Sequence, residues 1–146
     1  MDEQIQNFID SKHIGIVGVS RSKMKFGSTA YRTLKQKDYH LYPVNPALET
    51  IDGERCYRDV GELPGEVDAL LITVAPDKAE KIIESLGNGR FRRVWFQRGA
   101  DFSSAAQKAR DKGMEVVTGK CILMYAAPVQ SIHSFHRFVV KLFGKL

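Results

Sequence analysis

The stretch IGIVGVSRSKMKFG, residues 14–27, decides the fold of this chain. It begins with an apolar run, Ile14 to Val19, which is too short for a helix and typical of a buried strand. A loop of small and basic residues follows, and Ser28 is then positioned to cap a helix that runs to about Asp38. A strand, a glycine-containing loop and a helix N-terminus direct backbone N–H groups toward a phosphate. We therefore predict a phosphate-bearing ligand here; the alternative is an ordinary turn with solvated lysines.

The composition is that of one globular domain of 146 residues. No apolar run approaches the ~20 residues of a membrane span. The N-terminus has no signal-peptide pattern, so we expect a cytoplasmic protein without a membrane partner. The net charge of +5 comes from 22 Lys and Arg against 17 Asp and Glu, which suits an anionic small molecule at least as well as nucleic acid. Basic residues form no long run and are not interleaved with aromatic ones, so we predict no nucleic-acid partner.

Strands and helices are expected to alternate along the rest of the chain. Asp68 to Val74 has almost no polar alternation, as in strands that are buried on both faces of a parallel sheet. Asp77 and Glu80 are expected to form a capping box, and Asp52-Gly53 predicts a small hairpin. Further strands are expected at residues 40–44, 93–97 and 114–118, and further helices at residues 2–11, 77–86 and 102–112.

This alternation predicts an α/β fold with a Rossmann-like, doubly wound, mainly five-stranded parallel sheet and helices on both faces. In such sheets, ligands bind beyond the carboxyl ends of the strands, where the winding reverses. Those ends are expected at Ser20, Asn45, Ala75, Gln97 and Thr118.

The sequence does not match the common nucleotide-binding fingerprints. The loop has Gly15-x-x-Gly18 and a distant Gly27 instead of Gly-x-Gly-x-x-Gly, and Asn45 stands where an NAD site has an acidic residue. A Walker motif is absent. NADP remains an alternative ligand, in an oxidoreductase or a redox sensor, because Arg21 or Lys23 could contact its phosphate.

Several motifs nevertheless resemble those of the small CoA-binding proteins, which are similar to the first domain of the succinyl-CoA synthetase alpha subunit. They are Val-Gly-Val-Ser at 17–20 with a basic loop to Lys-Phe-Gly at 25–27, Pro-Val-Asn-Pro at 43–46, residues 68–76, Val-Trp-Phe-Gln at 94–97 with Gly99, and Lys-Cys at 120–121. The resemblance covers about residues 13 to 122.

The resemblance implies that coenzyme A binds at the carboxyl edge of the sheet. It implies that Gly18, Ser20 and Lys25 contact the phosphates. The adenosine side would be lined by Val44, Asn45, Pro46, Ala75 and Pro76. Our predicted set also includes Arg21 and Gly27 from the first loop and Gln97 from the fourth strand.

We expect binding without catalysis, and neither catalytic residues nor a metal site. The phosphohistidine domain of the synthetase has no counterpart, and no motif contains His13, His40, His133 or His136. Cys56 and Cys121 are expected to be free thiols. Cys121 follows the fifth strand, where it could react with a CoA thiol; the commoner role is an inert buried cysteine.

The C-terminal segment lies outside the resemblance. Pro128 is suited to the first turn of a helix that ends near Phe143. The apolar residues of this helix would cover roughly 200° of its circumference, whereas a helix that packs on one core needs an apolar face of only ~100°. We therefore predict one domain over residues 1–146 with an appended helix at 128–143 that forms a homodimer; the alternative is burial of that helix in its own chain.

Overall fold

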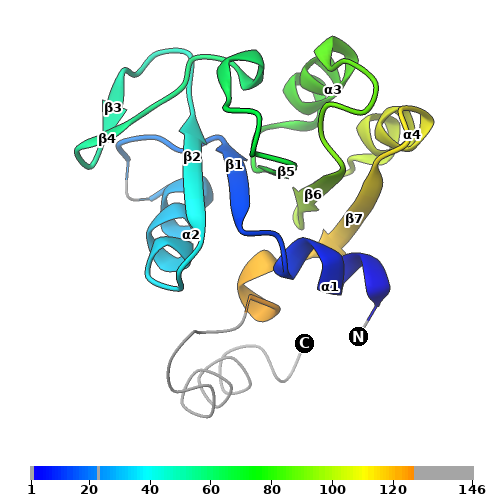
Figure 1. Cartoon of the computed structure of the whole chain (residues 1–146), viewed down its shortest axis with the longest axis horizontal. Coiled ribbons are helices and arrows are strands. Elements are labelled where there is room, and N and C mark those ends of the chain that lie inside the picture. Colours follow the sequence, from blue (N-terminus) through cyan, green and yellow to red (C-terminus); the bar gives the residue numbers. More distant parts are fainter. Residues whose placement is uncertain (1, 23, 127–146) are drawn as a thin grey trace.

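The computed structural model describes residues 2–22 and 24–126, and its centre is a parallel sheet (Figure 1). The five strands lie in the order β2-β1-β5-β6-β7, so the winding reverses between β1 and β5. The predicted doubly wound α/β fold is confirmed. The strands are β1 His13–Val17, β2 His40–Val44, β5 Ala69–Ile72, β6 Arg93–Gln97 and β7 Glu115–Lys120.

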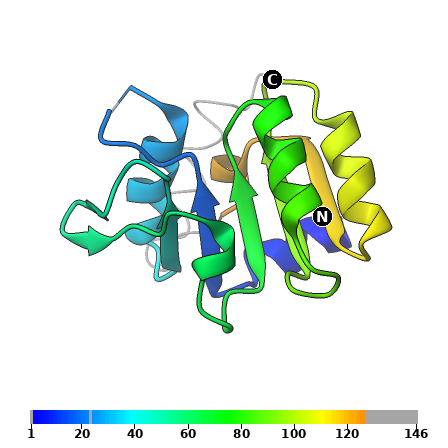
Figure 2. The same ribbon diagram turned by 90° about the horizontal axis from the view of Figure 1, so that it is seen from above.

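Helices cover both faces of the sheet (Figure 2). One face packs on α1 Glu3–Ile9, α2 Phe26–Lys35 and the short 3-10 helix η2 Ile122–Met124. The opposite face packs on α3 Pro76–Ser85, α4 Ser103–Asp111 and the 3-10 helix η1 Val60–Glu62.

The central strand β5 is buried on both faces, as its unbroken apolar sequence predicts. Leu70 and Ile72 belong to the core under α3 and α4, whereas Ala69 and Leu71 belong to the core under α1 and α2. All four residues have no exposed surface. Burial of both faces at alternating positions explains why the strand has no polar positions.

The hairpin predicted at Asp52-Gly53 is present. The strands β3 Thr50–Ile51 and β4 Glu54–Arg55 pair antiparallel across these two residues. Both turn residues have positive φ, 49° and 80°, which is the backbone conformation that two-residue hairpin turns require.

Two predicted helix starts are wrong. Helix α2 begins at Phe26 with Lys25 as its N-cap, so Ser28 lies inside the first turn, where its hydroxyl bonds the neighbouring loop. Helix α3 begins at Pro76 after Ala75, and proline is well suited to a first helical position. The predicted capping box does not form, because the Glu80 carboxylate instead accepts hydrogen bonds from Ser104 and Lys108 of α4.

The helix predicted at 128–143 lies outside the described residues. Within residues 2–22 and 24–126, no helix is both long enough and apolar enough to cross a bilayer.

Candidate functional site

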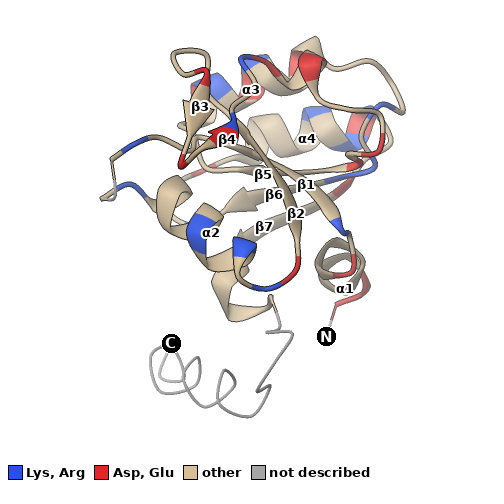
Figure 3. Ribbon diagram, turned by 60° about the vertical axis from the view of Figure 1, so that its left-hand side comes forward, with Lys and Arg blue, Asp and Glu red and all other residues tan. Residues whose placement is uncertain are grey.

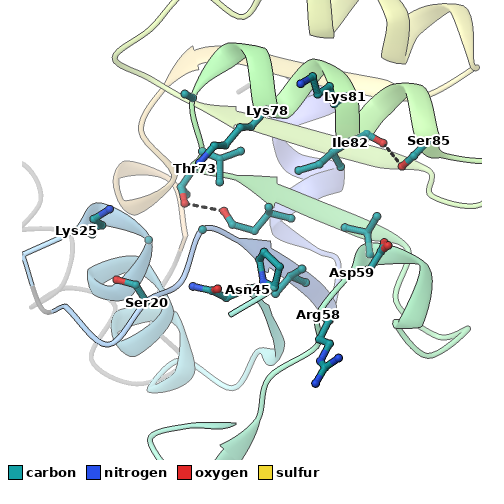
Figure 4. A pocket seen from close by; sticks show the side chains of 18 of the residues that line it. Ser20, Lys25, Asn45, Arg58, Asp59, Thr73, Lys78, Lys81, Ile82 and Ser85 are labelled. Carbon is teal, nitrogen blue, oxygen red and sulfur yellow. Dashed lines mark hydrogen bonds between the residues drawn. The ribbon is translucent and has the colours of Figure 1, made fainter. Parts of the chain in front are cut away.

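A pocket of about 830 Å³ lies at the carboxyl ends of β1, β2 and β5, where the winding reverses (Figure 4). It is enclosed by the loop after β1, the first turn of α2, the loops after β2 and β5, one side of α3 and the segment before η1. The predicted site residues that line it are Gly18, Ser20, Lys25, Gly27, Val44, Asn45, Pro46 and Ala75.

Three predicted site residues do not line this pocket. Arg21 is exposed, and its guanidinium donates to the carbonyl oxygen of Thr50 at 3.4 Å. Pro76 is the first residue of α3, next to Ala75. Gln97 is buried, and its side-chain oxygen accepts the backbone N–H of Ile122 at 3.1 Å, which ties the end of β6 to η2.

The loop after β1 packs against the end of β5 without room for a side chain. Gly18 has φ of 110°, and a Cβ atom there would lie 2.2 Å from the Thr73 hydroxyl oxygen. That hydroxyl donates to the carbonyl oxygen of Val17 at 2.7 Å. Glycine is therefore required both by the backbone angle and by the contact.

A serine pair fixes the same loop to α2. The buried Ser28 hydroxyl donates to the carbonyl oxygen of Ser20 at 2.6 Å and accepts the Ser20 backbone N–H at 3.2 Å. The Ser20 hydroxyl in turn accepts the backbone N–H of Ser22 at 3.2 Å. Residues 20–22 of the loop are thus held in place before any ligand arrives, so less order is lost on binding.

Asn45 joins the two loops on either side of the pocket. Its side-chain amide donates to the carbonyl oxygen of Val19 at 2.9 Å, and its side-chain oxygen accepts the backbone N–H of Ala47 at 2.8 Å. An aspartate could accept from Ala47 but could not donate to Val19. Asparagine at the end of β2 is therefore explained by this connection between loops.

The pocket is strongly basic. Lys25, Arg58, Lys78 and Lys81 line it, and Asp59 is the one carboxylate among its described lining residues. The first turn of α2 and the start of α3 also border the pocket, and helix N-termini favour anions. This arrangement can bind a ligand with several negative charges.

Sequence reasoning missed part of this basic surface. Lys78 and Lys81 are three residues apart on the helix that follows β5, a spacing that places them on one side of it. That spacing and position could have identified them. Arg58 lies in an irregular segment with no pattern, and only the packing of that segment beside β2 brings it to the pocket.

The described histidines lie at the other end of the sheet from the pocket. His13 begins β1 and His40 begins β2, and their rings stack with centroids 4.7 Å apart. Both cysteines are free and buried, and neither lines the pocket. Burial raises the pKa of the Cys56 thiol. Among residues 2–22 and 24–126, no group of His, Cys, Asp and Glu could hold a metal ion.

Comparison with known proteins finds a matching family and several proteins that this chain resembles. Residues 12–127 match the family described as CoA binding domain. The ADP-forming acetate–CoA ligase of Methanocaldococcus jannaschii is 28% identical over 86 residues, 59% of this chain and 12% of that protein. The alpha subunit of ADP-forming acetate–CoA ligase II from Pyrococcus furiosus is 37% identical over 75 residues, 51% of this chain and 16% of that protein.

A solved structure supports the fold over most of the chain. A hypothetical protein from Pyrococcus horikoshii OT3 superimposes with a TM-score of 0.76 at 27% identity, and the match covers 84% of this chain and 87% of that one. The chain thus spans a small part of the two ligases and most of this smaller protein.

Proposed function

The chain belongs to the CoA binding domain family, and from this membership we propose that it binds coenzyme A or an acyl-CoA at the carboxyl ends of β1, β2 and β5. The observation that carries the proposal is the basic pocket at the point where the winding reverses. Its position is where doubly wound sheets bind ligands, and its charge suits a phosphorylated one.

The diphosphate of CoA would lie at the first turn of α2. The early N–H groups of a helix have no partner within the helix, and Phe26 and Gly27 of this turn border the pocket. Lys25 supplies a mobile charge, and it forms no ion pair within the described residues. Ser20 adds a hydroxyl that the contact with Ser28 holds in position.

The adenosine would lie farther along the pocket, between β2 and α3. The apolar side chains of Val44, Val60, Val74 and Ile82 line this part. Pro46 restricts the backbone of the loop after β2, which also lines the pocket. Asn45 is already committed to Val19 and Ala47, so it would support the adenosine wall chiefly by holding that wall in place.

We propose that this domain binds its ligand without catalysing a ligase reaction. The two relatives described above belong to acetate–CoA ligases, but the chain spans a small part of each. The histidines of the described residues begin β1 and β2, at the opposite end of the sheet from the pocket. The test is incubation of the protein with CoA, ATP and acetate, in which we expect no CoA-dependent release of ADP or AMP.

Calorimetry with CoA, NADP and NAD separately tests the binding proposal. We expect CoA to bind and to raise the melting temperature, because a ligand at one hundred times its Kd stabilises the folded state by about 2.7 kcal/mol. NAD and NADP should bind weakly. Saturation by NADP without saturation by CoA would support the alternative of an NADP-dependent oxidoreductase or redox sensor and would refute our proposal.

A further inference from the structure

Charges are segregated across the two sides of α3. This helix carries both acidic and basic residues (Figure 3). Its carboxylates Glu80 and Glu84 face α4, where the Lys108 ammonium contacts them at 2.7 and 2.5 Å. Lys78 and Lys81 instead line the pocket. Because Glu80 and Glu84 are both engaged by Lys108 of α4, these carboxylates are directed away from the pocket, and the two lysines face it.

The lysines of α3 have no protein counterion within the described residues. Neither Lys78 nor Lys81 forms an ion pair there, although Asp77 lies one turn before Lys81. The pocket carboxylate of Asp59 accepts the backbone N–H of Gly61 at 2.8 Å, at the start of η1. The charge of the two lysines is therefore available to a ligand.

A third cation lies on the opposite wall of the pocket. Arg58 belongs to the segment between β4 and η1, and Figure 4 shows it across the pocket from α3. Its ion pair with Glu49 is 3.8 Å long, and the two side chains are 66% and 86% exposed. Ion pairs of this kind contribute little. Arg58 can therefore turn from Glu49 toward a more highly charged group.

These cations are separate from those at the first turn of α2. Figure 4 shows Ser20 and Lys25 at one end of the pocket, Lys81, Arg58 and Asp59 toward the other, and Lys78 between them, with its side chain extending toward Thr73. A diphosphate at α2 would leave the cations of α3 unpaired. A ligand that uses both groups must carry a second anionic group at a distance from its diphosphate.

We propose that Lys78 and Lys81, with Arg58 opposite, form a subsite for a phosphate monoester on the ribose of the ligand. This inference rests on the proposed function, under which the monoester is the 3′-phosphate of CoA. A phosphate monoester carries nearly two charges at neutral pH, so it is the part of CoA that most needs several cations. The subsite makes the protein selective for CoA over dephospho-CoA, which has the same diphosphate and pantetheine but lacks this group.

The test is calorimetry of the full chain with CoA and with dephospho-CoA. The variant Lys78→Gln/Lys81→Gln removes two charges from the pocket and keeps long, polar side chains on α3. Its matched control is Arg92→Gln/Arg110→Gln, which removes the same number of charges at exposed positions that do not line the pocket.

We expect the wild-type protein to bind CoA at least about tenfold more tightly than dephospho-CoA, because charge-assisted hydrogen bonds contribute this much or more. The lysine variant should bind dephospho-CoA with an affinity within about twofold of that of the wild-type protein. Its affinity for CoA should fall to the same level as its affinity for dephospho-CoA. The arginine control should keep the wild-type preference.

Two results would overturn the inference while leaving the proposed function standing. One is equal binding of CoA and dephospho-CoA by the wild-type protein. The other is an equal loss of affinity for both ligands in the lysine variant, which would mean that these lysines attract anions without distinguishing the monoester. If the wild-type protein binds neither ligand, the proposed function fails and the subsite fails with it.

Discussion

A Cβ atom placed on Gly27 would lie 2.4 Å from the carbonyl oxygen of Gly18. The first turn of α2 therefore packs directly on the loop after β1, and this contact sets the depth of the pocket at the proposed diphosphate position. Backbone atoms cannot move aside as the end of a flexible side chain can.

Gly27→Ala should therefore displace the helix from the loop. We expect it to lower the free energy of unfolding by about 1–3 kcal/mol, as overpacking does, and to weaken CoA binding. Urea unfolding and calorimetry measure the two effects. Gly87→Ala is the control, because nothing lies within 4 Å of a Cβ atom there. Equal stability and affinity of Gly27→Ala and the wild type would contradict this account of the loop.

Lys25→Ala should weaken CoA binding without destabilising the fold. Loss of a charge-assisted phosphate contact costs about 1.5–3 kcal/mol, or about tenfold to a hundredfold in Kd. The dependence of Kd on salt should also become shallower, since screened attraction is lost. Arg110→Ala, with its charge outside the pocket, is the control. Unchanged calorimetric affinity in Lys25→Ala would remove Lys25 from the site.

Asn45→Asp should destabilise the protein and should not improve CoA binding. The substitution removes the donor to the carbonyl oxygen of Val19 and places a carboxylate against that oxygen. We expect a loss of about 1–3 kcal/mol in unfolding free energy. Asn88→Asp makes the same change in charge at an exposed turn and serves as the control. Tighter CoA binding by Asn45→Asp would disprove the role given to this side chain.

The stability of the protein should decline at alkaline pH partly because of Tyr39. Burial, together with the nearby Asp10, raises the pKa of Tyr39 to about 12, and its hydroxyl donates to the carbonyl oxygen of Ile9 at 2.8 Å. The unfolded chain releases this proton at about pH 10. The contribution of Tyr39 is therefore complete below about pH 10 and is lost as the pH rises toward 12.

The measurement for Tyr39 is urea unfolding at a series of alkaline pH values. In Tyr39→Phe, the free energy of unfolding should decline less steeply with rising pH than in the wild type. Some decline should remain, because burial also raises the pKa of Tyr31 and Tyr42. Identical slopes for the wild type and the variant would show that Tyr39 is not a source of the pH dependence.

The apolar pattern of residues 128–143 predicts a homodimer, and this prediction concerns residues outside the described structure. Deletion of residues 128–146 should abolish dimerisation and leave CoA binding largely intact, because the match to the CoA binding domain family covers residues 12–127. Light scattering of both proteins tests this, and a monomeric full-length protein at high concentration would refute it.

The sequence by itself determined the element order and the class of the sheet. The apolar runs of β1 and β5 predicted buried parallel strands, because a strand covered on both faces has no position for a polar residue. The glycine and basic residues of the first loop predicted a ligand site at the end of β1, and the pocket borders that end. These are local patterns, and local patterns can be read along the chain.

Only the tertiary structure decided how the pocket is completed. Ser28 was predicted as a cap, but packing of α2 against the first loop commits its hydroxyl to Ser20. Arg58 and Lys81 are distant in sequence from Lys25. Lys81 reaches the same pocket because the strand order places β5 beside β1, and Arg58 reaches it because its segment packs beside β2. The two glutamates of α3 pair with one lysine of α4. Such pairings depend on which elements are neighbours in space, and the sequence of one segment does not contain that information.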